Sequence, residues 1–190
     1  MNTPNKLTLL RILLVPFFIF FLLNTYIKHN FFWSLLTFLF AALTDHLDGK
    51  LARKNNQITD FGKFLDPLAD KILVLSAFIC FVELNLISSI PVVIILSREL
   101  IITSIRLIST DKNRNISANK WGKFKTTSQM ITIIYILFLG EVYKNLNIGI
   151  NTESLLNYFN KTLICFTIIL TIFSGIVYIK ENLDLIKLSK

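Results

Sequence analysis

Residues 7–27 read LTLLRILLVPFFIFFLLNTYI, and Arg11 is the one charged side chain among these 21 residues. About 20 helical residues cross the hydrocarbon core of a bilayer, so this stretch predicts a membrane-spanning helix. A cleaved signal peptide is not indicated, because Arg11 and Pro16 interrupt the apolar run and no small-x-small cleavage site follows.

Similar apolar stretches recur along the rest of the chain. The six predicted spans are Leu7–Ile27, Phe31–Leu51, Ile72–Ser89, Ile90–Thr110, Thr126–Val142 and Leu155–Ile179. The connections at Lys28–Asn30 and Ser88–Ser89 are so short that the helices they join must be antiparallel. Since no internal repeat or low-complexity linker divides the chain, residues 1–190 are expected to form one all-α domain, a polytopic membrane protein with six transmembrane helices. The polar segment Asn145–Asn160 is expected to be an external loop.

The composition excludes several other classes of protein. Hydrophobic residues make up 53% of the chain and charged residues 17%, and the mean hydropathy is +0.60, which argues against a disordered or an ordinary soluble protein. The two cysteines, Cys80 and Cys165, lie inside apolar runs and do not indicate a disulfide framework. A net charge of +8 would suit a nucleic-acid binder, but the abundance of Phe, Ile and Leu argues against one.

The distribution of Lys and Arg predicts the orientation of the spans. With the N-terminus inside, 17 of the 20 basic residues fall at cytoplasmic helix ends, and only Lys28, Lys144 and Lys161 fall on the other side. The positive-inside rule therefore predicts that both termini are cytoplasmic and that residues 45–70 lie at the cytoplasmic membrane face. The net positive charge would also attract the anionic lipids of the membrane surface.

Acidic residues are concentrated in one part of the chain. Asp45 and Asp48 are three residues apart, and so project within roughly 60° of each other on a helix. Asp66 and Asp70 are four apart, within roughly 40°, near the start of the next span. If the two helices are neighbours, four carboxylates converge at the membrane surface, where they would repel one another unless cations neutralised them.

Carboxylate oxygens indicate a hard divalent cation, Mg²⁺, Mn²⁺ or Ca²⁺, rather than zinc. Solvated helix-end charges are the alternative, with Asp66 capping a helix that Pro67 opens. Asp60 resembles part of a turn or an N-cap, and His46 points about 100° away from Asp45, so both are left out of the predicted metal site.

Small residues lie between the two pairs of aspartates. Gly49 and Gly62 lack a Cβ atom and allow another group to approach the helix backbone, and Ala52 continues the smooth face next to Arg53. Such a face could hold a nucleotide diphosphate, or it could simply let helices pack closely. The spacing alone does not decide between these two roles.

The full pattern Asp-x-x-Asp-Gly-x-x-Ala-Arg-x8-Gly-x-x-x-Asp-x-x-x-Asp, from Asp45 to Asp70, resembles the signature of the CDP-alcohol phosphotransferases. Residues 4–11 (PNKLTLLR), 97–99 (SRE) and 122–126 (GKFKT) are similar to segments of the bacterial members that use glycerol 3-phosphate. The resemblance covers most of the chain and is weakest in its last third.

The resemblance implies an activity and a set of site residues. The reaction would join CDP-diacylglycerol and sn-glycerol 3-phosphate to give phosphatidylglycerophosphate and CMP, at the cytoplasmic face of a bacterial inner membrane. Two Mg²⁺ or Mn²⁺ ions would be held by Asp45, Asp48, Asp66 and Asp70, with Asp70 also the general base. Gly49, Ala52, Arg53 and Gly62 would contact the CDP part, and the family is known for homodimers.

The acceptor is inferred from basic residues that lie within or beside the spans. Glycerol 3-phosphate is a dianion, and Arg98 and Arg106, eight residues apart, lie on roughly the same side of a helix. Charges inside spans are costly and indicate function. Lys123 and Lys125 begin the next span at the same face, although they could equally be topology anchors. These four residues are predicted to bind the acceptor, and Glu99 is a structural partner that could explain one of the arginines.

Three other functions compete with this one. A phosphatidylserine or cardiolipin synthase would use the same lipid nucleotide. A membrane prenyltransferase also uses aspartate-rich motifs, but generally carries them in separate halves of a longer chain. A divalent-cation transporter would place its aspartates near the midplane, often within repeats.

Overall fold

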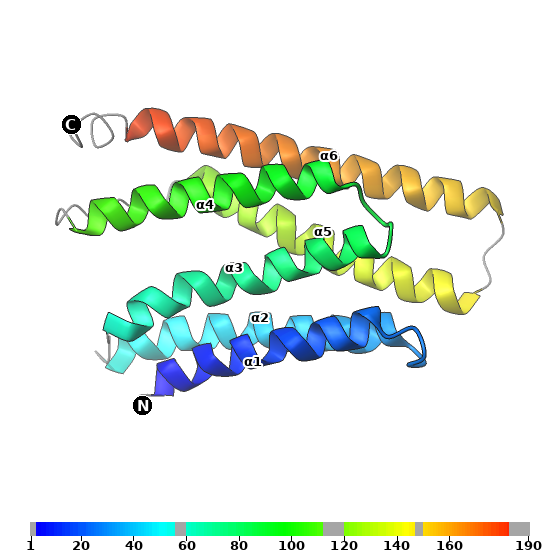
Figure 1. Cartoon of the computed structure of the whole chain (residues 1–190), viewed down its shortest axis with the longest axis horizontal. Helices are drawn as coiled ribbons and strands as arrows, with labels where there is room; N and C mark the ends of the chain where they lie inside the picture. Colours follow the sequence, from blue (N-terminus) through cyan, green and yellow to red (C-terminus); the bar gives the residue numbers. More distant parts are fainter. Residues whose placement is uncertain (1–2, 56–59, 112–119, 147–149, 183–190) are drawn as a thin grey trace.

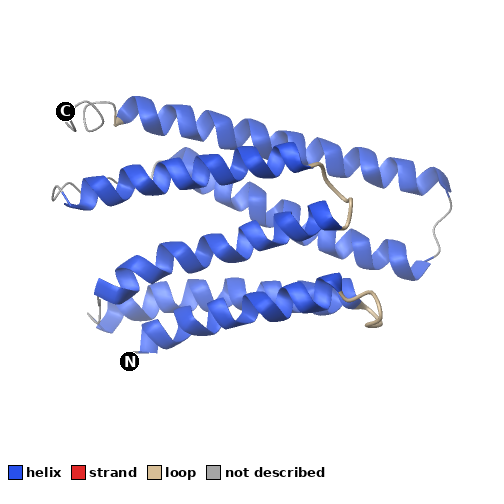
Figure 2. Ribbon diagram, viewed as in Figure 1, coloured by secondary structure: helices blue, strands red, loops and turns tan. Residues whose placement is uncertain are grey.

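Six long helices make up the computed structural model of the chain (Figure 1). They are α1 (Thr3–Leu23), α2 (Asn30–Asn55), α3 (Asp60–Glu83), α4 (Ser89–Asp111), α5 (Lys120–Leu146) and α6 (Ile150–Glu181). The structure describes residues 3–55, 60–111, 120–146 and 150–182, of which residues 3–7, 45–55, 60–67, 70, 107–111, 146 and 150–157 are described by their backbone alone. Every regular element within these ranges is a helix, so the prediction of an all-α chain is confirmed (Figure 2).

Successive helices run in opposite directions along one bundle. α1 begins and α6 ends at the same end, where α2 ends, α3 begins, α4 ends and α5 begins (Figure 1). We call this the aspartate end, because Asp45–Asp70 leads to it. α1 packs on α2 and α3, α6 packs on α4 and α5, and α2 also contacts α5.

The core is built from the apolar stripes of these helices. Phe18 of α1 lies against Phe38 of α2 with 5.9 Å between the ring centroids, and Phe78 and Phe81 of α3 meet edge to face at 6.3 Å. All four rings are buried. The outer surface is also apolar, since large hydrophobic side chains are exposed on every helix, including Phe17, Phe40, Ile79, Val93, Phe138 and Ile169.

Two of the described helices contain stretches that are long and apolar enough to cross a membrane, Lys120–Asn145 and Tyr158–Glu181. Shorter apolar stretches lie in α1 and α2, at Thr8–Leu23 and Asn30–Thr44. The described helices therefore have the apolar character expected of the chain, but only two of them are long and apolar enough over their described residues to cross a membrane.

Several predicted boundaries are wrong because capping groups, not hydropathy, end the helices. α1 ends at Leu23 rather than Ile27, where the Asn24 side chain accepts a hydrogen bond from the backbone N–H of Tyr26 at 3.1 Å. α3 ends at Glu83 rather than Ser89, because Asn85 adopts a left-handed φ of 56°. This geometry is typical of a C-cap, and here the N–H of Leu86 donates to the carbonyl oxygen of Phe81 at 2.9 Å.

Other helices start earlier than predicted because helical hydrogen bonding continues through polar sequence. α3 starts at Asp60 rather than Ile72, so Pro67 lies inside the helix and does not open it. α5 starts at Lys120 rather than Thr126. The predicted external loop Asn145–Asn160 is also wrong, since α5 continues to Leu146 and α6 begins at Ile150.

Candidate functional site

The predicted metal and nucleotide residues are all on helical backbone that leads to the aspartate end. Asp45, Asp48, Gly49, Ala52 and Arg53 lie on α2, and Gly62, Asp66 and Asp70 lie on α3. Their side chains are outside the described part of the structure, so no contact among them is assigned. Among the side chains that are described, no group of three His, Cys, Asp or Glu could hold a metal ion.

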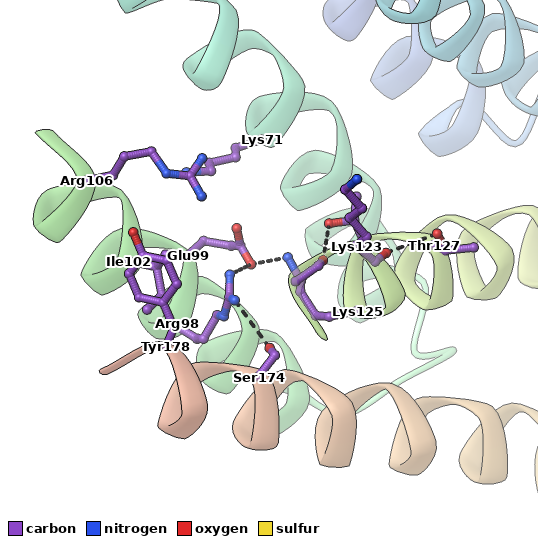
Figure 3. Close-up of a pocket in the computed structure, with 12 residues that line it drawn as sticks. Lys71, Arg98, Glu99, Ile102, Arg106, Lys123, Lys125, Thr127, Ser174 and Tyr178 are labelled. Carbon is purple, nitrogen blue, oxygen red and sulfur yellow. Dashed lines mark hydrogen bonds and ion pairs between the residues drawn. The ribbon is translucent and has the colours of Figure 1, made fainter. Parts of the chain in front are cut away.

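A polar cavity of about 390 Å³ opens between α3, α4, α5 and α6 (Figure 3). We call it the cationic pocket, and it is lined by Lys71, Arg98, Glu99, Ile102, Arg106, Gly122, Lys123, Lys125, Thr126, Thr127, Ser174 and Tyr178. Five of these side chains are cationic and one is anionic. The pocket therefore carries a net formal charge of +4, which suits an anionic ligand.

All four basic residues predicted to bind the acceptor line this one pocket. Arg98 and Arg106 come from α4, and the eight-residue spacing does bring both to the same side. Lys123 and Lys125 come from the first turns of α5. The structure thus brings these four residues together from two consecutive helices.

Glu99 is the centre of a buried ion-pair network in the pocket. Its Oε1 atom accepts a hydrogen bond from Nη1 of Arg98 at 3.3 Å and another from Nζ of Lys125. Lys125 is 3% exposed and Glu99 is 7% exposed. Arg98 also donates through Nη2 to the hydroxyl oxygen of Ser174 at 3.2 Å. One carboxylate therefore joins α4 to α5, and Arg98 extends the network to α6.

A second set of hydrogen bonds ties α3 to α4 at the same place. The ammonium group of Lys71 donates to the hydroxyl oxygen of Thr103. That hydroxyl in turn donates to the backbone carbonyl of Glu99 at 2.6 Å. Lys71 directly follows Asp70 in the chain, so these bonds connect the aspartate segment of α3 with the cationic pocket.

The pocket also contains polar residues that the sequence does not indicate as site residues, among them Lys71, Ser174 and Tyr178. In the sequence Lys71 contributes to the orientation signal, and Ser174 and Tyr178 lie inside the predicted span Leu155–Ile179. Tyr178 is 3% exposed, and no hydrogen bond to its hydroxyl group is formed by the described residues. The four-residue spacing of Ser174 and Tyr178 places them on one face of α6, a signal that becomes informative once α6 is known to pack on α4.

The two exposed cations of the pocket differ from the buried ones. Arg106 and Lys123 are exposed, whereas Arg98 is 13% exposed at its side chain and Lys125 is 4% exposed at its side chain. Among described residues Lys123 forms no ion pair. The two cations bound to Glu99 are thus largely shielded from solvent, whereas Arg106 and Lys123 are exposed.

Comparison with known families finds one that matches most of the chain. The model of the CDP-alcohol phosphatidyltransferase family matches residues 1–174. This range includes the aspartate segment and all the lining residues of the cationic pocket except Tyr178.

Curated bacterial proteins are similar to this chain over most of their length. A CDP-diacylglycerol–glycerol-3-phosphate 3-phosphatidyltransferase of Bacillus subtilis is 40% identical over 147 residues, which cover 72% of this chain and 76% of the relative. The protein of the same name from Wigglesworthia glossinidia brevipalpis is 42% identical over 154 residues, covering 79% and 84%. The one from Escherichia coli K12 is 38% identical over 148 residues, covering 75% and 80%.

Proposed function

The chain belongs to the CDP-alcohol phosphatidyltransferase family, and we propose that it transfers the phosphatidyl group from CDP-diacylglycerol to sn-glycerol 3-phosphate. The products are phosphatidylglycerophosphate and CMP. The names of the relatives support this choice of donor and acceptor. Within the structure, the observation that carries it is the net charge of +4 in the cationic pocket.

A phosphorylated acceptor explains the charge of that pocket. Glycerol 3-phosphate carries up to two negative charges, and guanidinium and ammonium groups bind phosphate with charge-assisted hydrogen bonds. Serine is zwitterionic and would not need five cationic side chains. We assign Arg98, Arg106, Lys123 and Lys125 to the acceptor, with exposed Arg106 and Lys123 contacting its phosphate and the buried pair shaping the pocket behind them.

A divalent metal ion fits the donor set of the aspartate segment. The family is generally dependent on divalent metals, and four carboxylates suit Mg²⁺ or Mn²⁺. Asp45 and Asp48 on α2, with Asp66 and Asp70 on α3, would hold two ions. When bound, such ions neutralise charge on the pyrophosphate and on the departing CMP.

The residues of the chain then have separate roles in the transfer. Gly49, Ala52, Arg53 and Gly62 would bind the CDP part. Asp70 takes the proton from the 1-hydroxyl group of the acceptor as that oxygen bonds to the phosphorus attached to the lipid. The bond from this phosphorus to the CMP oxygen breaks, and CMP leaves with the electron pair.

The proposal includes a membrane setting. Six spans with both termini in the cytoplasm agree with the distribution of basic residues and with a bundle in which α1 begins and α6 ends at the same end (Figure 1). The active site would then lie at the cytoplasmic face of a bacterial inner membrane, where one substrate is in the bilayer and the other in the cytosol. Residues 1–190 would act as one domain. From the resemblance to the family, we also propose that the protein is a homodimer.

A CMP-release assay with the purified protein tests this function. Glycerol 3-phosphate, serine and phosphatidylglycerol are compared as acceptors, each with Mg²⁺ or Mn²⁺ and with a chelator. We expect CMP release with glycerol 3-phosphate and a metal, and none with the chelator. Release with serine or phosphatidylglycerol in its place would refute the assigned acceptor.

The predicted aspartates are tested in the same assay. Asp66→Ala and Asp70→Ala should abolish CMP release, because each removes a proposed metal ligand, while the proteins still insert into the membrane. Turnover that survives either change would contradict the assigned metal site.

A further inference from the structure

Glu99 is a carboxylate in a pocket that otherwise suits an anion. It is 7% exposed and lines the cationic pocket beside the arginine and lysine side chains. A negative charge at this position opposes the binding of a phosphate group. We therefore ask what a carboxylate at this position does that a neutral residue would not do.

The two oxygen atoms of Glu99 have different surroundings. Oε1 accepts the hydrogen bonds from Arg98 and Lys125. Oε2 accepts none from the part of the chain that the structure describes. Figure 3 shows both dashed lines ending on one oxygen, with the other oxygen turned toward the region where Lys71 and Arg106 lie. An ionised carboxylate has acceptor sites on both oxygens, so Oε2 is an acceptor that faces the ligand space.

The network holds this oxygen in a fixed direction. Arg98 is bound at once to Glu99 and to Ser174 on α6, at 3.3 Å and 3.2 Å. Lys125 binds the same Oε1 atom from α5. Because two helices restrain Oε1, rotation of the carboxylate is limited and Oε2 is preorganised for a donor.

We propose that Oε2 of Glu99 accepts a hydrogen bond from the 2-hydroxyl group of the acceptor, which makes Glu99 a specificity-determining residue for a polyol phosphate. This inference rests on the proposed function. The cations bind the phosphate of the acceptor and Asp70 takes the proton of the 1-hydroxyl, so the 2-hydroxyl is the remaining polar group. A site built to bind a substrate hydroxyl discriminates strongly against an analogue that lacks it, because its own polar group is then left unpaired.

The matching analogue is 3-hydroxypropyl phosphate, which keeps the reacting hydroxyl and the phosphate and lacks only the 2-hydroxyl. We compare kcat/KM for glycerol 3-phosphate and for this analogue, by CMP release, in the wild type, Glu99→Gln, Glu99→Asp and Ser174→Ala. The wild type should prefer glycerol 3-phosphate by about 10- to 100-fold, the range expected for a hydrogen bond to a charged group.

The variants distinguish a role of Glu99 in binding the 2-hydroxyl group from a role only in stabilising the pocket. Glu99→Gln, which loses the charge, and Glu99→Asp, which withdraws the oxygen, should each lower the preference by about tenfold. Ser174→Ala removes one restraint on Arg98 but leaves Lys125 bound to Glu99, so it should lower the preference less than either Glu99 variant does, whatever its effect on absolute rates. The KM for CDP-diacylglycerol should stay unchanged in both Glu99 variants.

If the wild type uses glycerol 3-phosphate and 3-hydroxypropyl phosphate with equal kcat/KM, the proposal is refuted. This test needs no variant, so it still applies if Glu99→Gln fails to fold. Equal losses for both acceptors in a folded Glu99 variant also refute it, since they indicate a purely structural carboxylate. Failure of the wild type to release CMP with glycerol 3-phosphate would instead overturn the proposed function. The two failures are therefore distinguishable.

Discussion

Burial distinguishes Lys125 from Arg106 and Lys123 among the cations of the pocket. Lys125 is 3% exposed and bound to Glu99, whereas Arg106 and Lys123 line the same cavity and are exposed. A buried charge is costly unless it is paired, so the lysine and the glutamate depend on each other. An exposed cation remains hydrated in the folded protein, so its replacement should affect the fold less than that of a buried one.

Replacing Arg106 should therefore affect acceptor binding selectively. In Arg106→Ala the KM for glycerol 3-phosphate should rise by about 10- to 100-fold, the loss expected for charge-assisted hydrogen bonds to phosphate. The KM for CDP-diacylglycerol should not change. Steady-state CMP release with each substrate varied in turn measures both constants.

Lys161→Ala is the matched control for Arg106→Ala, because Lys161 is an exposed cation that lines a different cavity, one bordered by the α3–α4 connection. Its kinetics should equal those of the wild type. Unchanged acceptor kinetics in Arg106→Ala would remove that residue from the acceptor site.

Lys125 should behave in the opposite way, as a residue needed for stability. Lys125→Met leaves Glu99 with Arg98 as its partner, so the expected loss is about 1–3 kcal/mol, below the about 3–5 kcal/mol of a fully stranded buried charge. Lys123→Met should change acceptor kinetics and leave stability unaltered. Thermal unfolding in detergent micelles compares the two, and equal melting temperatures would contradict the assigned roles.

The cations of α4 and α5 could be predicted because charges within or beside apolar spans stand out in the sequence. Lys71, Ser174 and Tyr178 could not, since their place in the pocket depends on how α3 and α6 pack against α4. Only one of the two pairings of Glu99 can be predicted from the sequence. The sequence predicts Glu99 as a partner of one of the two arginines, which the structure shows to be Arg98, whereas Lys125 reaches Glu99 from another helix.

At the level of the helices, hydropathy predicts the number of elements well and their ends poorly. Apolar runs indicate where a helix is buried or meets lipid, but backbone hydrogen bonds continue into polar sequence. This is why α3 includes the residues from Asp60 and α6 those from Ile150. The ends at Leu23 and Glu83 are instead set by turns around Asn24 and Asn85.

The contact between α2 and α5 depends on a glycine. A Cβ atom at Gly140 would lie 2.5 Å from Cδ1 and from Cε1 of the Phe31 ring, closer than van der Waals packing allows. Gly140→Ala should therefore lower the stability by about 1–3 kcal/mol, as overpacking usually does. Gly122→Ala is the control, because a Cβ atom there meets nothing within 4 Å, and its melting temperature should not fall.

A second change tests whether the Phe31 ring causes that loss. In a Phe31→Leu background the ring is gone, so Gly140→Ala should cost measurably less than it does alone, a coupling expected of residues in contact. Melting temperatures of the two single variants and the double variant give the cycle. Additive losses would mean that Gly140 acts through some other feature of α5.

Across the whole molecule, the two halves of the proposed chemistry share one end of the bundle. The second half of α2 and the first half of α3 contain the aspartates and lead to the end of the bundle where α4 ends (Figure 1). The cationic pocket includes side chains from the first turns of α5 and the last turns of α4 and α6. The opposite end contains the α1–α2 and α3–α4 connections (Figure 1). A donor held in the bilayer and a soluble acceptor can meet at such an end only if it faces the compartment that contains the acceptor.

Cysteine labelling in cells tests that orientation. In a background with Cys80→Ala and Cys165→Ala, a membrane-impermeant maleimide should label Lys28→Cys, in the exposed α1–α2 connection, in intact cells. Lys120→Cys and Lys180→Cys, at the start of α5 and near the end of α6, should be labelled only after permeabilisation. The positive-inside rule predicts this pattern because basic residues concentrate at the aspartate end. The reverse pattern would put the aspartates and the cationic pocket outside the cell, away from cytosolic glycerol 3-phosphate, and would overturn the proposed site even if the purified protein released CMP.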